Sequence, residues 1–202
     1  MGGDALLENK HKKVIRDIIL IGASTGGPNA IEKVITGFGD NINAAVLVVQ
    51  HMPSGFTKAF AERLNKKCRF EVIEARDGSK IEKNKVYIAP GGYHMVVKEP
   101  GIIRLNQEQP VWGVRPAVDK LFISASSIYS SRIISVVLTG MGKDGAKGTV
   151  EVKRNDGITI VQDEDTCVIY GMPKVALETG HVDYVVPIDK IASKIQSLIS
   201  NK

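Results

Sequence analysis

Three short loops contain residue types that together perform acyl transfer. The first loop, residues 22–26, reads G-x-S-x-G around Ser24, and its glycines permit a sharp turn that exposes the serine hydroxyl. His51 directly follows an apolar run, and Asp144 lies between glycines in a later loop. A neutral imidazole can accept the serine proton, and a carboxylate can fix the tautomer of that imidazole. The pattern predicts a serine hydrolase with Ser24 as nucleophile, His51 as general base and Asp144 as the orienting acid.

Backbone amides near these side chains are candidates for an oxyanion hole. Pro28 suits the first turn of a helix that begins directly after the serine loop. Amides at a helix N-terminus carry partial positive charge, so those that face Ser24 can stabilise a developing oxyanion. The glycine-flanked amides near Met141 are a second candidate for the same role.

Two binding functions compete for the same loops. A lone G-x-S-x-G turn also occurs as a phosphate-binding loop or a plain tight turn. Residues 140–145 match the G-x-G-x-x-G of dinucleotide-binding folds, and the acidic residues 163–164 follow the next strand at about the spacing of a ribose contact. Against this, Asp144 would place a negative charge where a pyrophosphate binds, and Ser24 and His51 would have no role.

Asp144 and the histidine also have other interpretations. Asp144 suits the N-cap of a helix predicted over residues 144–154, a role compatible with catalysis. An α/β-hydrolase would use the order Ser24, Asp144, His181. In that fold several strands precede the nucleophile, whereas here Ser24 follows the first predicted strand, so His51 is the favoured base.

The elements that must position these loops alternate between strands and helices. Continuous apolar runs at residues 17–21, 44–49 and 133–138 predict strands buried on both faces. Amphipathic stretches between the strands predict helices, which makes the fold class α/β with a mostly parallel sheet. Residues 93–97 and 102–105 predict a small antiparallel hairpin. Because ligands bind at the carboxyl ends of parallel strands, the three loops are expected at one edge of the sheet.

Composition excludes several other classes of protein. The 202 residues carry a net charge of +5 and only 5% aromatic residues, so a base-stacking nucleic-acid surface is not expected. Cys68 and Cys167 lie far apart and predict neither a disulfide framework nor a zinc site. No run approaches the ~20 apolar residues of a membrane span. We expect a cytoplasmic protein without metal or cofactor, with residues 1–16 as a linker or disordered tail and residues 17–202 as one catalytic domain.

Taken together, the loops resemble the catalytic domain of the CheB family, the bacterial chemotaxis receptor methylesterases. The matching segments, which follow the family order, read IGASTGGP, QHMPSGFT, IAPGGYHM, RPAVDKLF, LTGMGKDGAKG and QDEDTCVIYGMPKVA. The resemblance implies a doubly wound sheet with helices on both faces. It also implies hydrolysis of glutamate methyl esters to glutamate and methanol on methyl-accepting chemotaxis receptors, and deamidation of receptor glutamines, without a cofactor.

The resemblance assigns roles by position. It implies Ser24 as nucleophile, His51 as base and Asp144 as orienting acid, with Thr25 and Met141 in the active-site surround. It also implies a receiver domain in the full-length family member, contact with the membrane only through the receptor, and no nucleic-acid partner.

Two further expectations concern the surroundings of the site. Lys143 precedes Asp144 where many relatives carry a small or neutral residue, so its side chain should point away from the carboxylate. Gln162, Asp163 and residues 167–172 lie at late strand ends, where they either line the cleft or simply pack in a loop.

Overall fold

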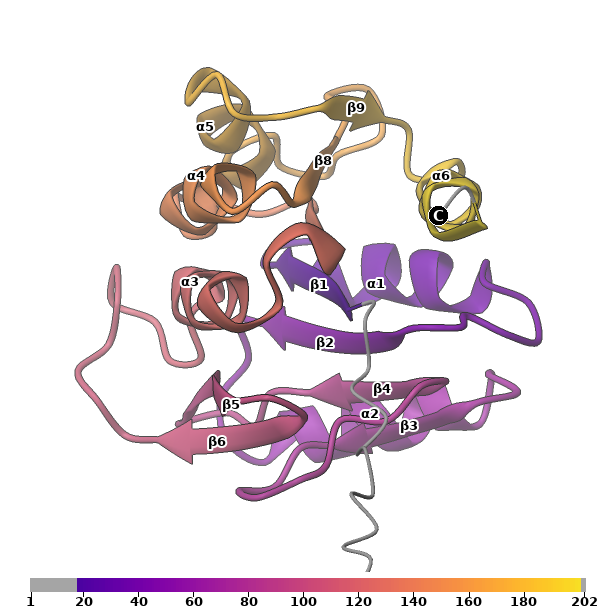
Figure 1. Cartoon of the computed structure of the whole chain (residues 1–202), viewed down its shortest axis with the longest axis vertical. Helices are drawn as coiled ribbons and strands as arrows, with labels where there is room; N and C mark the ends of the chain where they lie inside the picture. The colour runs from indigo at the N-terminus through magenta and orange to yellow at the C-terminus, as the bar shows by residue number, and fades with distance from the viewer. Residues whose placement is uncertain (1–17, 201–202) are drawn as a thin grey trace, which may run out of the picture.

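A seven-stranded parallel sheet forms the middle of the protein (Figure 1). The computed structural model describes residues 18–200, so the predicted tail lies outside the described residues. Every pairing in this sheet is parallel, which confirms the predicted fold class. In the spatial order of the sheet, the strands are β3 (Glu71–Glu74), β4 (Lys85–Ile88), β2 (Ala45–Gln50), β1 (Ile18–Ala23), β7 (Ile133–Val137), β8 (Ile158–Gln162) and β9 (Tyr184–Val186).

Helices cover both faces of the sheet. One layer contains α1 (Gly27–Thr36), α2 (Phe56–Asn65) and α6 (Ile191–Ser200). The opposite layer contains α3 (Val118–Tyr129), α4 (Ala146–Arg154), α5 (Met172–Glu178) and the antiparallel hairpin of β5 (His94–Glu99) and β6 (Ile102–Asn106). A short 3-10 helix, Ser130–Arg132, leads into β7. Within the described residues, no helix is long and apolar enough to cross a membrane.

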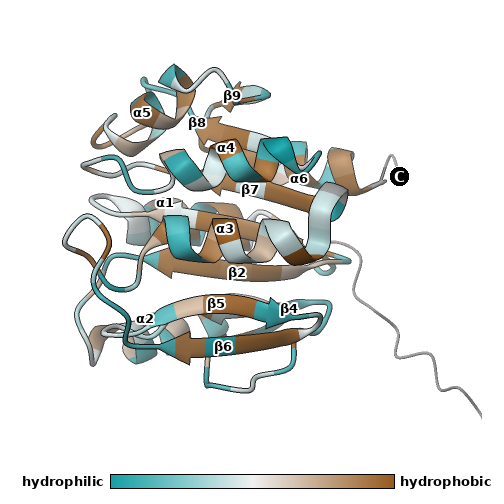
Figure 2. Cartoon of the chain, turned by 60° about the vertical axis from the view of Figure 1, so that its left-hand side comes forward, coloured by the Kyte–Doolittle hydropathy of each residue, from teal (hydrophilic) through white to brown (hydrophobic). Residues whose placement is uncertain are grey.

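The central strands are apolar throughout because helices pack on both of their faces. Successive strand side chains point to opposite faces. In β1, Ile19 and Ile21 belong to the core under α1, whereas Ile18 and Leu20 belong to the core under α3. All four are fully buried, and each contributes about 1.5–3 kcal/mol to stability. Figure 2 shows the same pattern, with apolar strands inside and the polar residues of α3 and α4 on the outer side.

The strand order brings the three predicted loops to one edge of the sheet. Strand β1 lies between β2 and β7, and the register pairs Ala23 with Gln50 and Gly22 with Val137. Ser24 and His51 directly follow the paired residues, so both emerge at the same height above the sheet. The Asp144 loop leaves the neighbouring strand β7 at this edge.

The hairpin is attached to the rest of the fold through a buried histidine. His94, at the start of β5, is fully buried; its Nδ1 accepts a hydrogen bond from the Ala117 amide at 3.2 Å, and its Nε2 donates to the Gln109 carbonyl at 3.1 Å. Desolvation by burial lowers the pKa of this imidazole. The neutral ring therefore links the hairpin to the segment that enters α3.

The lowered pKa of His94 predicts a loss of stability in acid. Between the lowered folded pKa and the unfolded value of about 6.5, the unfolded chain binds more protons, so the unfolding free energy falls as the pH drops through that interval. Urea unfolding, measured at one pH above this interval and one below it, gives the decrease in the free energy of unfolding. This decrease should be larger for the native protein than for His94→Gln. An equal loss in both proteins would contradict this role for His94.

Candidate active site

His51 and Asp144 form a direct hydrogen bond at the carboxyl edge of the sheet. His51 Nε2 lies 2.7 Å from Asp144 Oδ2, and the two side chains are 11% and 2% exposed. An ionised carboxylate only accepts hydrogen bonds, so the proton lies on Nε2. The bond therefore leaves Nδ1 of a neutral His51 as the basic nitrogen.

The Asp144 carboxylate is fixed by the N-terminus of α3. Its Oδ2 accepts the Val118 amide at 2.6 Å and its Oδ1 accepts the Asp119 amide at 2.9 Å. The cap predicted for the following helix is wrong, because the N-cap residue of α4 is Gly145 and the Asp144 side chain binds no amide of α4. The left-handed φ of 97° at Gly145 turns the chain, and the carboxylate of Asp144 binds the earlier helix instead.

A second buried carboxylate completes a reciprocal arrangement of the two helices. Asp119 Oδ1 accepts the amides of Gly145 and Gly148 at 2.9 and 2.8 Å, and its Oδ2 accepts the Trp112 indole N–H at 2.9 Å. Burial, followed by the nearby charge of Asp144, raises the pKa of Asp119, and the three hydrogen bonds oppose this rise. The start of α4 thus binds a carboxylate from α3, and the start of α3 binds a carboxylate from the loop that precedes α4.

This arrangement does not support the dinucleotide interpretation. The amide of Gly145, at the N-terminus of α4, already donates to the Asp119 carboxylate, and the Gly140 amide donates to the Ile169 carbonyl at 3.0 Å. A pyrophosphate would need these amides and would meet a buried negative charge at the helix terminus where it should bind. The G-x-G-x-x-G spacing here serves loop packing and helix capping.

Ser24 is half-buried and held between the loops of the other two candidates. Its amide donates to the Thr139 carbonyl at 3.0 Å, which ties it to the end of β7. Gln50 Nε2 donates to the carbonyls of both Ser24 and His51, at 3.0 and 3.1 Å. The sequence analysis did not identify Gln50 as a functional residue. The only feature that could have indicated it is that a polar residue stands at the end of an otherwise apolar strand. Gln50 fixes the nucleophile loop relative to the histidine loop.

The glycine at 140 lets the third loop pack directly on Ser24. A Cβ at Gly140 would lie 2.8 Å from the Cβ of Ser24 and 2.4 Å from the Met172 sulfur. The structure therefore brings all three loops into contact. The Ser24 hydroxyl is not hydrogen-bonded to His51 here, and such bonds often tighten only when substrate binds.

Thr25 directly follows Ser24, and Met141 directly follows Gly140, which packs on Ser24. Thr25 is exposed and Met141 is 74% exposed. The Thr25 carbonyl accepts the Thr139 hydroxyl at 3.0 Å, which fixes its peptide. Among residues 18–200, the amides of Thr25 and Met141 donate to no other residue, whereas the Gly27 amide already donates to the Ser24 carbonyl at 2.8 Å. The Thr25 and Met141 amides are therefore available to an oxyanion.

His181 belongs to the opposite edge of the sheet. Its carbonyl accepts the Thr159 hydroxyl at 2.7 Å, near the amino end of β8, and its ring nitrogen Nδ1 contacts the Thr179 carbonyl at 2.7 Å. The alternative of Ser24, Asp144 and His181 is therefore not assembled by this fold.

The late loop expected near the cleft packs against the nucleophile loop through Thr139. The Thr139 hydroxyl accepts the amides of Val168 and Ile169 at 3.1 and 3.0 Å, and Gln162 Oε1 accepts the Thr139 amide at 2.8 Å. Val168 is 67% exposed, so this segment also forms part of the rim. Burial raises the pKa of Cys167 to about 11, so its sulfur is an unreactive thiol at neutral pH.

Lys143 points away from the Asp144 carboxylate, as the sequence analysis predicted. Its ammonium lies 3.9 Å from the centre of the Trp112 ring. A cation over an indole face is electrostatically favourable. The Asp144 carboxylate therefore keeps His51 and the α3 amides as its partners.

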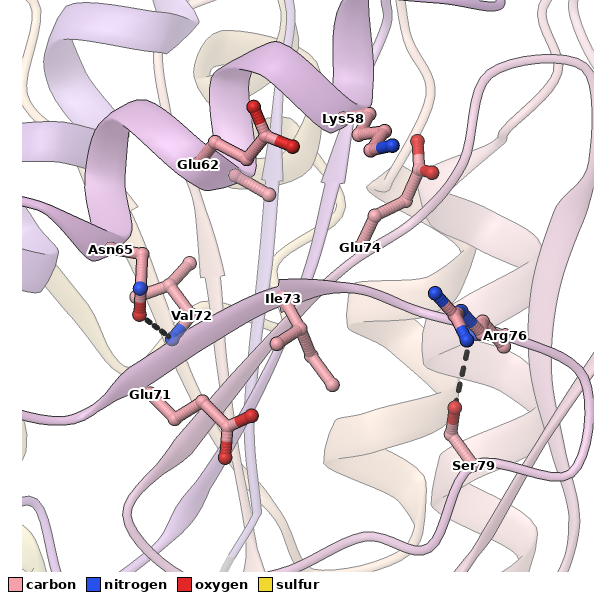
Figure 3. A pocket seen from close by; sticks show the side chains of 10 residues that line it. Lys58, Glu62, Asn65, Glu71, Val72, Ile73, Glu74, Arg76 and Ser79 are labelled. Carbon is pink, nitrogen blue, oxygen red and sulfur yellow. Dashed lines mark hydrogen bonds between the residues drawn. The ribbon is translucent and has the colours of Figure 1, made fainter.

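Of two hollows in the protein surface, one is lined by His51 and the other lies away from the candidate site. A hollow of about 290 Å³ opens beside His51 and is lined also by Met52, Pro53, Val114 and Arg115. A hollow of about 590 Å³ lies elsewhere, between α2 and the edge strand β3, and charged side chains such as Lys58, Glu74 and Arg76 line it (Figure 3). Only the first hollow can hold a substrate side chain against the imidazole. Residues 18–200 contain no cluster of three metal-ligating side chains.

The fold and the site define a class of three-layer α/β proteins that gather a serine, a histidine and an aspartate at the carboxyl ends of the central strands. The CheB methylesterase family model matches residues 19–195. The chain belongs to this family.

Relatives of known name and structure agree with this assignment. The protein-glutamate methylesterase/protein-glutamine glutaminase of Clostridium acetobutylicum is 61% identical over 183 residues, 91% of this chain and 53% of that protein. Its namesake in Pyrococcus abyssi is 49% identical over 194 residues, 92% of this chain and 53% of that protein. The CheB methylesterase catalytic domain of Thermotoga maritima superposes with a TM-score of 0.88 at 44% identity, covering 90% of this chain and 98% of that domain. The chain spans about half the length of the curated relatives it matches.

The capping role of Asp144 predicts that its substitution lowers the free energy of unfolding, whereas substitution of Ser24 does not. Asp144→Ala leaves the buried amides of Val118 and Asp119 without an acceptor and should lower the free energy of unfolding by about 2 kcal/mol. Ser24→Ala should change it by less than about 0.5 kcal/mol. Urea unfolding compares the two variants, and amide exchange should quicken at Val118. Equal stability of both variants would show that Asp144 does not hold α3.

Proposed function

We propose that this chain is a serine hydrolase that removes methyl esters from glutamate side chains of chemotaxis receptors. The observation that carries the proposal is the part-buried His51–Asp144 hydrogen bond beside Ser24, at the carboxyl ends of adjacent parallel strands. Membership of the CheB methylesterase family and the names of the relatives support the substrate class.

The mechanism begins with attack of Ser24 on the ester carbonyl. His51 accepts the hydroxyl proton on Nδ1, because Nε2 already donates to Asp144. The imidazolium that forms is stabilised by the buried carboxylate. The negative charge on the tetrahedral oxygen is held by the amides of Thr25 and Met141, which have no other acceptor among the described residues.

The second half of the reaction regenerates the enzyme. His51 gives its proton to the departing methoxide, so methanol leaves and an acyl-serine remains. Water then loses a proton to His51 and attacks the acyl carbonyl, and Ser24 leaves with that proton to release the glutamate. Every proton is carried by His51, and no step calls for a metal or a cofactor.

The same groups provide for deamidation of glutamine. Attack of Ser24 on a side-chain amide gives the same acyl-serine, with ammonia leaving in place of methanol after His51 protonates the amine. The relatives' names pair the two activities. The hollow beside His51 holds either side chain, because a methyl ester and a primary amide are similar in size.

The partners belong to the proposal as well. The substrates are the cytoplasmic helical bundles of methyl-accepting receptors, and membrane contact is through the receptor alone. A receiver domain is the partner implied by the family for a full-length member. The reaction takes place in the cytoplasm and uses no nucleic acid.

Methanol release from methylated receptor membranes tests the function. The native chain should release methanol, and Ser24→Ala should lose activity by about 10⁴-fold or more, because it removes the nucleophile. Ser54→Ala is a matched control, since it removes an exposed hydroxyl near His51 that has no part in the mechanism. Full activity of Ser24→Ala would refute the proposal, as would an equal loss in Ser54→Ala.

A further inference from the structure

A groove of about 400 Å³ lies on the α3 side of the molecule, outside the hollow that holds His51. It runs between α3 and the β5–β6 hairpin and reaches the first turn of α4. Its apolar lining comes from Val96, Val111 and Ile123, and its basic residues are Lys98, Lys120 and Lys147. Ile123 is 41% exposed within it. The groove therefore combines an apolar floor with a basic rim.

The positive charge of this rim is only partly neutralised. Lys120 pairs with Glu108 at 2.5 Å, the one exposed carboxylate in the groove lining. Lys98 and Lys147 are exposed, and no carboxylate of residues 18–200 forms an ion pair with either. The Asp119 carboxylate is buried and accepts three hydrogen bonds from the protein itself. Lys98 and Lys147 thus carry charge at the groove that no ion pair with a carboxylate of the described residues neutralises.

Trp112 adjoins the groove through its contacts with two lining residues, Asp119 and Lys147. Trp112 is 43% exposed, and its indole N–H is fixed on Asp119. The ammonium groups of Lys143 and Lys147 lie 3.9 and 4.9 Å from the centre of its ring. Tryptophan is among the residue types that most often dominate binding energy in protein interfaces.

The groove is connected to the catalytic groups through one residue. The side chain of Asp119 lines the groove, while its backbone amide donates to Asp144 Oδ1 at 2.9 Å. The groove and the His51–Asp144 pair are therefore linked through Asp119.

We propose that the groove binds an acidic, amphipathic segment of the substrate protein next to the ester being hydrolysed. This inference rests on the proposed function. Hydrolysis of each ester leaves a free glutamate carboxylate on the substrate protein, and such carboxylates are complementary in charge to Lys98 and Lys147. Apolar residues one helical turn away match the floor formed by Val96, Val111 and Ile123.

Charge reversal at two lysines tests this docking surface. Lys98→Glu combined with Lys147→Glu should raise KM for methanol release from methylated receptor membranes by about tenfold. The rate with a small neutral ester such as p-nitrophenyl acetate should stay within about twofold, because the reacting groups are untouched. A glutamate in the first turn of α4 is favourable for the helix, so the fold is retained.

The matched control reverses two exposed lysines on the other face of the sheet. Lys33→Glu with Lys66→Glu changes the net charge equally but lies on α1 and at the end of α2. KM for the receptor should change far less in this variant. Rising salt should raise KM of the native protein and have a smaller effect on the groove variant.

The outcomes separate this inference from the proposed function. An unchanged KM in the groove variant, or the same increase in the control, overturns the docking surface while the esterase activity stands. A native dimer in sedimentation that the groove variant dissociates would assign the groove to a second copy and would also overturn it. Absence of methanol release by the native protein, with p-nitrophenyl acetate still hydrolysed, would instead refute the proposed substrate.

Discussion

The Asp144 carboxylate, buried at the edge of the sheet, accepts hydrogen bonds from both the fold and the proposed base. Burying a carboxylate is costly unless its oxygens are satisfied, and here two α3 amides and the His51 ring donate to it. The partial positive charge at the N-terminus of α3 stabilises the anion further. The imidazole is therefore oriented by a group whose own position is set by a helix, and not by a mobile loop.

Other polar contacts extend this constraint to the nucleophile. Asp119 holds the start of α4, which fixes the chain on the far side of Asp144. Gln50 donates to the carbonyls that follow β1 and β2, so the serine and histidine loops cannot move independently. Groups that react must be held within a fraction of an ångström, and supporting hydrogen bonds of this kind provide that precision. Thr139 has a similar part, because it joins the nucleophile loop to the late loop.

The sequence was sufficient to predict a mostly parallel sheet and the convergence of the loops at one edge, but not the order of the strands. Apolar runs such as residues 133–138 indicated strands covered on both faces, and the carboxyl-edge rule then placed Ser24, His51 and Asp144 together. The cap was predicted incorrectly, because local spacing pairs Asp144 with the next helix, whereas its real partners are 25 and 26 residues upstream. Gln50 was missed for a related reason. A buried glutamine shows its role only once the two carbonyls it binds are known to be neighbours.

The most direct measurement of the central claim is nitrogen NMR of the ring of His51 at a pH where the imidazole is neutral. The account predicts a proton on Nε2, held by Asp144, and a bare Nδ1 able to accept from the serine. It also predicts that Asp144→Asn shifts this tautomer balance. A proton found on Nδ1 in the native protein, or a tautomer balance that is unchanged in Asp144→Asn, would contradict the account.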